Sequence, residues 1–378
     1  MSYAKYNGVA KADIVKIDGA AIASIAKCDG VEAGAAGATR WVVALDDAFL
    51  GYAAASDLTS WTTYDHLSGT GHPEAFDICA GKDGSGNLIY VSSRNSVSSE
   101  VQVSGTDVTS TSDWTSVDLD DGAGDADVYR IIWVDNGSTS GVWLAVGRQT
   151  TTGIYRSTDG AANWSNVSFD GLSGHDDTRG IQAMAFGNGV VMCAQDERIY
   201  TSTDYGANWS VSTPFSTNTP TAARCLTYTN SSWVLICGRL GELRIRSCAD
   251  SDLTDWSGEY TANTSTRNPS NTFEETVVIA SHNGRVCHIT CKDRYLSYFD
   301  VNGKTVSNIS MVTLDMNSAS NRAEDIATDG AGTWLIAARE GDIWRSTNDG
   351  EAWTKVIDDL GGINDHAQGI CSDVLTVV

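Results

Sequence analysis

The sequence predicts an all-β fold made of similar four-stranded units, and three observations lead to this prediction. Short runs rich in Val, Ile, Thr and Trp recur between turn residues. Glycine is plentiful, with 37 residues, whereas proline, which cannot donate a ladder hydrogen bond, occurs 4 times. A Ser-x-Asp-x-Gly-x-x-Trp turn also recurs with variations at roughly 40-residue multiples, which indicates an array of repeated units.

The clearest copy of this turn runs from Ser202 to Trp209, between strand-like runs at 198–201 and 210–213. Its aspartate carboxylate can accept backbone N–H groups of the turn, its glycine permits positive φ, and its tryptophan covers the corner with apolar area. We call these segments corner turns. The structural residues expected in the three best copies are Asp159, Trp164, Asp204, Trp209, Asn348 and Trp353. Shorter variants end at Trp61, Trp114 and Trp256.

Each complete unit contains four expected strands, which are clearest at 180–186, 189–194, 198–201 and 209–213. The matching units begin near Phe76, Tyr129, Ala223, Thr276 and Asp325, which makes six complete units. The unit at 276–315 lacks a corner turn, and we expect Asn302 and Gly303 to form its hairpin turn instead.

The two ends of the array complement each other. Residues 39–64 resemble the last three strands of a unit, and Gln368–Asp373 resembles the missing first strand. We therefore predict that the C-terminal strand joins the N-terminal unit and closes a seven-bladed β-propeller over residues 37–378. Closure removes the exposed sheet edges that an open array would carry.

Residues 1–36 differ in kind from the rest. Asn7-Gly8, Asp18-Gly19 and Asp29-Gly30 recur every eleven residues, and such pairs mark tight turns between short strands. Three units of this size cannot build a core of their own. We expect a short extended N-terminal arm that docks on another surface, and the alternative is a weakly ordered leader.

The formal net charge is −23, from 25 basic and 48 acidic residues. This charge disfavours binding to nucleic acid or to anionic membranes. No apolar run reaches the length of a membrane span, so we expect no membrane insertion. The nine cysteines lack zinc-binding spacing, and we expect most of them to be free buried thiols.

The connections between successive units predict a candidate binding face at the mouth of the channel, on the side of the ring opposite the corner turns. Polar patterns recur there, and three of the six histidines lie at equivalent places. The expected site for a cation or a glycan comprises His72, Asp127, His175, Asp177, Asp365 and His366. The alternative interpretation is that these are solvated loops that cap the channel.

One of these connections is dense in carboxylates. Ca²⁺ takes six to eight oxygen ligands, so we name Asp118, Asp120, Asp121, Asp125 and Asp127 as a candidate calcium site. The segment lacks a complete calcium-loop signature, and we expect no other cofactor.

The corner turns resemble the Asp-box or BNR repeats of sialidase-like and photosystem II assembly factor-like β-propellers. The eleven-residue units, such as Lys16-Ile17-Asp18-Gly19-Ala20, resemble leaders of bacteriophage tail and other virion proteins. A sialidase would carry an arginine triad, a Tyr–Glu nucleophile pair, an aspartic acid and an Arg-Ile-Pro segment, in a ring of six blades. This chain has no Arg-Ile-Pro and predicts seven blades. A photosystem assembly factor would carry an export signal, which the first residues do not resemble.

We therefore expect no catalytic residues and no enzyme activity. The expected function is that of a structural or adhesion subunit of a bacteriophage virion, associated with its tail, fibre or neck. Residues 1–36 would dock on other virion proteins in a multi-copy assembly, and the propeller would bind a partner, a host-surface glycan or a receptor. The alternatives are a glycan-active propeller enzyme and an intracellular scaffold propeller.

Overall fold

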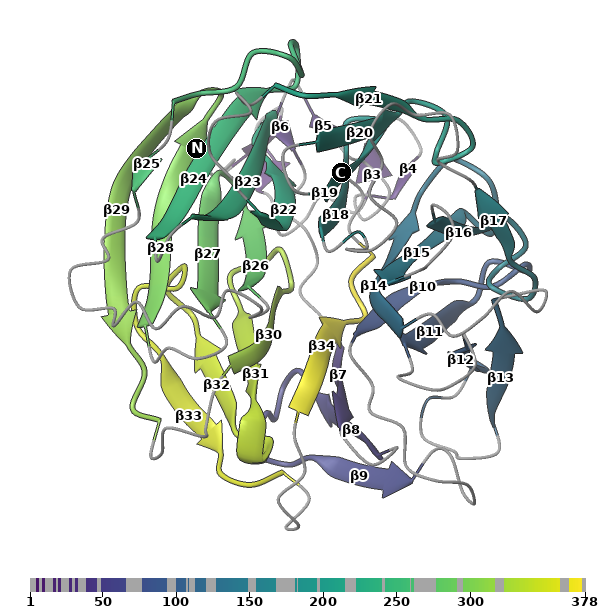
Figure 1. Ribbon diagram of the computed structural model, residues 1–378. Coiled ribbons are helices and arrows are strands. Elements are labelled where there is room, and N and C mark those ends of the chain that lie inside the picture. Colours follow the sequence, from purple (N-terminus) through teal and green to yellow (C-terminus); the bar gives the residue numbers. More distant parts are fainter. Residues whose placement is uncertain are drawn as a thin grey trace.

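The chain forms a ring of seven four-stranded antiparallel blades around a central axis (Figure 1). The computed structural model describes residues 5–6, 9–10, 16–17, 20–21, 27–28, 31–32, 39–45, 49–65, 77–93, 100–106, 108, 113–119, 127–148, 154–167, 181, 183–195, 198–214, 222–239, 242–258, 260–261, 277–290, 295–316, 323–360 and 367–375. In this part of the chain, no helix is long and apolar enough to cross a membrane. The predicted fold class, a closed seven-bladed β-propeller, is confirmed.

The strands of each blade follow one another in the order given below, and the first strand of each lies nearest the centre of the ring (Figure 1). Blade 1 consists of β34 (Ala367–Ser372), β7 (Arg40–Leu45), β8 (Phe49–Ala54) and β9 (Thr62–Asp65). Blade 2 consists of β10 (Ile78–Lys82), β11 (Leu88–Ser93), β12 (Glu100–Ser104) and β13 (Trp114–Asp118). Blade 3 consists of β14 (Asp127–Val134), β15 (Val142–Arg148), β16 (Ile154–Ser157) and β17 (Ser165–Val167). Blade 4 consists of β18 (Ala183–Gly187), β19 (Val190–Gln195), β20 (Arg198–Ser202) and β21 (Ser210–Ser212).

Blade 5 consists of β22 (Ala222–Thr229), β23 (Ser232–Arg239), β24 (Glu242–Ala249) and β25 (Tyr260–Thr261). Blade 6 consists of β26 (Val277–His282), β27 (Arg285–Thr290), β28 (Tyr295–Asn302) and β29 (Thr305–Thr313). Blade 7 consists of β30 (Ala323–Thr328), β31 (Trp334–Ala338), β32 (Ile343–Ser346) and β33 (Thr354–Ile357). A short 3-10 turn at Arg339–Gly341 links β31 to β32. These bounds agree closely with the strands expected from the repeats.

Blade 1 is the point at which the ring closes. The C-terminal strand β34 pairs antiparallel with β7, with Ile370 opposite Val43. Beyond the ladder, the backbone N–H of Thr39 donates to the Asp373 carboxylate at 2.8 Å, and the N–H of Asp373 donates to the carbonyl of Arg40 at 3.1 Å. The predicted closure is therefore correct, and it ties strands from the two ends of the repeat array into one sheet.

The core lies between neighbouring blades and is densest at their second strands. Trp41, Trp143, Trp233 and Trp334 stand near the start of this strand in blades 1, 3, 5 and 7, and all four are fully buried. Burial of a large apolar side chain contributes about 1.5–3 kcal/mol, so these four residues are major contributors to the stability of the ring.

Three small hairpins precede the ring. They are β1 (Lys5–Tyr6) with β2 (Val9–Ala10), β3 (Lys16–Ile17) with β4 (Ala20–Ala21), and β5 (Lys27–Cys28) with β6 (Val31–Glu32). In the first hairpin Tyr6 pairs with Val9, so two residues connect the strands. The same register recurs in the other two hairpins. Within residues 1–36, the described parts are thus short strands joined by two-residue turns, as the Asn-Gly and Asp-Gly pairs predicted, and the docking of this arm stays a prediction.

The hairpin turn of blade 6 differs by one residue from the expectation. Asn302 pairs with Thr305, so the connecting residues are Gly303 and Lys304 rather than Asn302 and Gly303. Gly303 has a φ of 58°, the left-handed conformation that glycine adopts without a steric penalty.

Candidate functional site in the central channel

The inner strands surround a cavity of about 170 Å³ at the centre of the ring. Four of these strands carry a register shift next to the cavity, between Val128/Arg130, Ala223/Cys225, Ala323/Asp325 and Ala367/Gly369. A β-bulge of this kind re-aims the side chain that follows it. Arg130, Cys225 and Asp325 thereby occupy equivalent places in three blades, and all three line the cavity.

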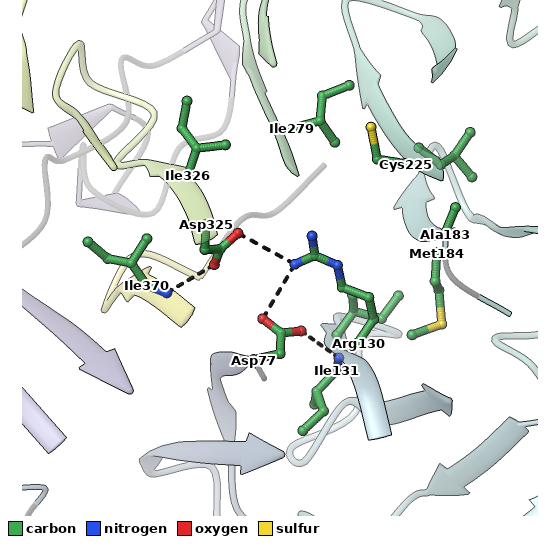
Figure 2. A pocket seen from close by; sticks show the side chains of 12 residues that line it. Asp77, Arg130, Ile131, Ala183, Met184, Cys225, Ile279, Asp325, Ile326 and Ile370 are labelled. Atoms are coloured by element: carbon green, nitrogen blue, oxygen red, sulfur yellow. Dashed lines mark hydrogen bonds and ion pairs between the residues drawn. The ribbon is translucent and has the colours of Figure 1, made fainter. Parts of the chain in front are cut away.

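Three charged side chains meet in this cavity (Figure 2). Nη1 of Arg130 lies 3.6 Å from Oδ1 of Asp77 and 3.5 Å from Oδ1 of Asp325. Arg130 comes from β14 in blade 3, Asp77 directly precedes β10 in blade 2, and Asp325 belongs to β30 in blade 7. Because blades 1 and 2 lie between blades 7 and 3, the arginine reaches across the channel. We call these three residues the channel triad.

Each carboxylate of the channel triad also joins two neighbouring blades. Oδ2 of Asp77 accepts a hydrogen bond from the backbone N–H of Ile131 at 2.8 Å, which links blade 2 to blade 3. Oδ2 of Asp325 accepts one from the N–H of Ile370 at 2.9 Å, which links blade 7 to blade 1. The channel triad therefore connects four blades, including the blade at which the ring closes.

Burial determines the electrostatics of the channel triad. Burial is the main cause that raises the pKa of Asp77 to about 7; the Arg130 guanidinium opposes the shift, and the nearby Asp325 carboxylate adds to it. Burial likewise raises the pKa of Asp325, again opposed by Arg130. Burial disfavours the charged form of Arg130, but the two carboxylates outweigh this effect and raise its pKa above the ordinary value. The guanidinium is therefore charged at any physiological pH.

The rest of the cavity wall is largely apolar and includes Met184, Leu226 and Ile279. A pair of glycosidase carboxylates needs one group free to donate a proton and another free to attack or to activate water. In the channel triad both carboxylates contact the same guanidinium and accept backbone N–H groups. This arrangement is suited to holding blades together across the channel.

Most of the binding residues expected from the sequence lie outside the described residues. They are His72, Asp120, Asp121, Asp125, His175, Asp177, Asp365 and His366. Of the remaining two, Asp118 ends β13 opposite Glu100, and Asp127 begins β14 opposite Arg148, so they belong to different blades. Within the described ranges, no three His, Cys, Asp or Glu residues come together as a metal site would require. The proposed face and calcium site remain predictions.

The corner turns have a common hydrogen-bond pattern. In blade 4, Oδ1 of Asp204 accepts from the backbone N–H of Asn208 at 2.8 Å, and Trp209 Nε1 donates to the carbonyl of Gly206 at 3.1 Å. Burial opposes ionisation of Asp204, but hydrogen bonds from Asn208 and its neighbours lower its pKa to about 2. The equivalent indole bonds are Trp164 to Ala161 at 3.0 Å and Trp353 to Gly350 at 2.9 Å. Asp159 and Asn348 accept backbone N–H groups in the same way.

The corner turns also lie against neighbouring blades. Arg156 in blade 3 donates from Nε to the carbonyl of Tyr205 in the corner turn of blade 4, at 2.9 Å. Gly160, in the corner turn of blade 3, abuts the backbone of Asp83 and Gly84 in blade 2. These residues therefore contribute to contacts between blades.

The channel triad was not among the residues expected from the sequence. The available signal was positional, because Asp77-Ile78, Arg130-Ile131 and Asp325-Ile326 occupy the same place in the repeated inner strand. Aligning the repeats and asking which position carries charge in an otherwise apolar strand would have found all three.

The comparisons with known proteins support the fold. No protein-family model matches the chain, and no curated protein matches it. The solved structure of YCF48 bound to D1 peptide is similar, with a TM-score of 0.54, 12% identity, and coverage of 84% of this chain and 94% of that one. PorZ, a bacterial surface component of the type-IX secretion system of Porphyromonas gingivalis, gives a TM-score of 0.52, 11% identity and coverage of 86% of this chain. This chain spans 37% of the length of PorZ. At such identities the likeness shows a β-propeller fold alone.

Proposed function

We propose that this chain is a non-catalytic structural and adhesion subunit of a bacteriophage virion, associated with its tail, fibre or neck and attached through residues 1–36. The observation that carries the proposal is the set of three hairpins that precede the closed ring and repeat every eleven residues. A ladder of two residue pairs is too small to be stable alone. Such hairpins need a surface to pair with or to pack on, and neighbouring virion proteins would provide it.

The distribution of charge supports attachment through this segment. Residues 1–36 contain four basic and four acidic residues, so the whole formal charge of −23 lies on residues 37–378. Like-charged rings repel one another at short range, whereas the neutral segment carries no such penalty. In a multi-copy assembly the segments can therefore gather on the particle while the rings point outward.

The channel triad supports a non-catalytic role. Its two carboxylates are engaged with Arg130 and with backbone N–H groups of adjacent blades. We propose that the ring is a rigid carrier and that its ligand, a partner protein or a host-surface glycan or receptor, binds at the face formed by the connections between blades. YCF48, which is similar in fold, has been solved with a peptide bound, and a peptide segment of a partner protein is one candidate ligand of this face.

Deletion of residues 1–36 tests the attachment. The host would supply either the full chain or the truncated chain during particle assembly, and purified particles would be probed for each. We expect the full chain in the particles and the truncated chain in the unassembled fraction, with both rings melting at the same temperature. Incorporation of the truncated chain at the level of the full chain would overturn the proposal.

A second variant keeps the chain length. Replacing Gly8, Gly19 and Gly30 together by valine disfavours the left-handed turn conformation that Asn-Gly and Asp-Gly pairs adopt in two-residue hairpins. We expect this variant to be excluded from particles like the truncated chain. Normal incorporation would show that the hairpins are not the attaching structure.

A further inference from the structure

The central cavity lies toward the end of the ring at which the connections between blades enter. Each connection leads into the inner strand of the next blade. Arg130 and Cys225 are the fourth residues of β14 and β22, Ile279 is the third residue of β26, and Asp77 directly precedes β10. The cavity is therefore beneath the face on which we propose that the ligand binds.

Arg130 has hydrogen-bond donors beyond those that face the carboxylates. A guanidinium carries five N–H groups in a planar fork, and the ion pairs with both carboxylates of the channel triad run to its Nη1 atom. In Figure 2, Nη2 points away from the carboxylates, toward the side of the cavity where Ile279 and Cys225 lie. The side chain of Arg130 lines the cavity and keeps 21% of its surface exposed. Nη2 can therefore donate to an acceptor that enters the cavity.

The size and the wall of the cavity limit what can enter. Pockets for drug-sized ligands have volumes of about 300–1,000 Å³, whereas this cavity has about 170 Å³. It therefore suits a single substituent of a ligand rather than the whole ligand. The wall formed by blades 4, 5 and 6 is apolar at Met184, Leu226 and Ile279. The substituent must therefore present an apolar part to this wall as well as an acceptor to Arg130.

The charge of the channel triad favours an uncharged substituent. With both carboxylates ionised, the two aspartates outweigh the one arginine, and the whole chain carries a formal charge of −23. An anionic group would therefore be repelled as well as desolvated in the cavity. A cationic group would be repelled by Arg130, which already lies between the two carboxylates. An uncharged carbonyl oxygen can accept from the guanidinium without either cost.

An acetamido group meets these requirements together. Its carbonyl oxygen can accept a hydrogen bond from Nη2 of Arg130, its methyl group can contact the apolar wall, and it carries no charge. The side-chain amide of a peptide Asn or Gln ends in an NH₂ group, which would lie unpaired against that wall. Among the ligands proposed for the ring, this chemistry favours a glycan that carries N-acetylated amino sugars over a peptide.

We propose that the central cavity binds the acetamido group of an N-acetylated amino sugar, with Arg130 as the donor to the carbonyl oxygen. The sugar ring itself stays outside the cavity, at the face formed by the connections between blades. Arg130 then has two roles, because Nη1 holds the carboxylates of neighbouring blades and Nη2 binds the ligand. This inference rests on the proposed function, since it names the class of glycan that the ring binds.

Saturation-transfer difference NMR of the purified full chain at pH 8 tests the class of ligand. With N-acetylglucosamine as the probe, we expect the strongest saturation at the acetyl methyl protons. Glucose and glucosamine, which lack the acetyl group, should bind about 10-fold more weakly or worse, because Nη2 then loses its acceptor. No saturation of N-acetylglucosamine would overturn the proposal. Displacement of the sugar by an equal concentration of the tripeptide Gly-Gln-Gly would overturn the assignment to a glycan.

Two variants place the binding in the cavity. Ile279→Phe fills part of the cavity at a half-buried position and leaves the three charged residues unchanged. It should weaken binding of N-acetylglucosamine by about 10-fold or more, whereas the matched control Ile309→Phe, on the exposed outer strand β29, should bind like wild type. Arg130→Lys keeps a counter-charge for both carboxylates but lacks the fork of a guanidinium, so the folded variant should also lose binding. Wild-type affinity in Ile279→Phe or in Arg130→Lys would show that the sugar binds elsewhere.

The failure of this inference and the failure of the proposed function give different results. Incorporation of the chain without residues 1–36 into particles would overturn attachment through the hairpins, and the sugar would still bind to the ring. Normal exclusion of that truncated chain from particles, together with no binding of N-acetylglucosamine to the full chain, would overturn the cavity assignment and leave the virion role in place.

Discussion

The carboxylate of Asp325 in β30 accepts a hydrogen bond from the backbone N–H of Ile370 in β34 at 2.9 Å. This bond joins the last complete blade to the strand that closes the ring. Asp77 makes the same kind of bond to the next blade, and Arg130 contacts both carboxylates across the channel. The side chains at the centre of the ring thus reinforce the closure made by the β34–β7 ladder.

Replacing Arg130 by methionine should strongly destabilise the ring at pH 8. The substitution keeps most of the side-chain volume but leaves two buried carboxylates without a counter-charge. Loss of one partner from a buried ion pair costs about 3–5 kcal/mol. Urea unfolding measures the effect. The triple variant Arg130→Met/Asp77→Asn/Asp325→Asn should recover most of the lost stability, and an Arg130→Met variant as stable as wild type would contradict the role of the channel triad.

The pH dependence of stability should reflect Asp77. Its folded-state pKa of about 7 lies above the ordinary value of 3.8, so between these values the folded state holds a proton that the unfolded state has released. The contribution of Asp77 to stability therefore falls as pH rises through this window and is constant above it. Urea unfolding between pH 5 and 8 should show a decline that is reduced in Asp77→Asn. The same slope in both proteins would refute the assignment.

Two glycines with the same backbone conformation allow the stability cost of close packing to be measured apart from the cost of backbone strain. Gly160 and Gly137 both have a φ of 79°, but a Cβ on Gly160 would lie 2.1 Å from the backbone nitrogen of Gly84, whereas one on Gly137 meets nothing within 4 Å. Gly137→Ala should cost about 1–2 kcal/mol through strain alone. Gly160→Ala should cost at least about 1–3 kcal/mol more, because it overpacks the contact between blades. Equal losses in thermal unfolding would show that the corner turn does not pack as described.

Deletion of residues 367–378 should lower the melting temperature sharply. It removes β34 and Asp373, leaves the inner side of β7 unpaired, and eliminates the hydrogen bonds from Ile370 to Asp325 and from Thr39 to Asp373. The milder variant Asp373→Ala, which loses the hydrogen bonds to Thr39, should cost about 1 kcal/mol. Differential scanning calorimetry measures both, and an unchanged melting temperature after the deletion would show that β34 does not stabilise the ring.

The sequence predicted those features that depend on local pattern. The closing strand was recognisable because Gln368–Asp373 repeats the pattern of the other inner strands. The hydrogen bonds of Asp204 in its corner turn involve residues within four positions of it. No local pattern marks the channel triad, because its members are far apart in the chain and meet only after the ring has formed; the signal lies in the equivalent position that they occupy in three repeated inner strands. The type of a charged residue in a single sequence also does not show whether its side chain is buried or exposed.

The shape of β29 shows a similar limit. The hairpin turn expected at Asn302 and Gly303 implied a strand after it, but the length of that strand, its bulge at Asn308 and the exposure of Ile309 depend on where it lies in the ring. The sequence pattern therefore predicted the element and not its edge position.

The most direct measurement of the proposed function is cryo-electron microscopy of the particle that contains this chain. We predict that residues 1–36 will lie against a neighbouring subunit and that the ring of residues 37–378 will project outward. A map in which the ring itself packs into the particle, with residues 1–36 away from every neighbour, would contradict attachment through the N-terminal hairpins.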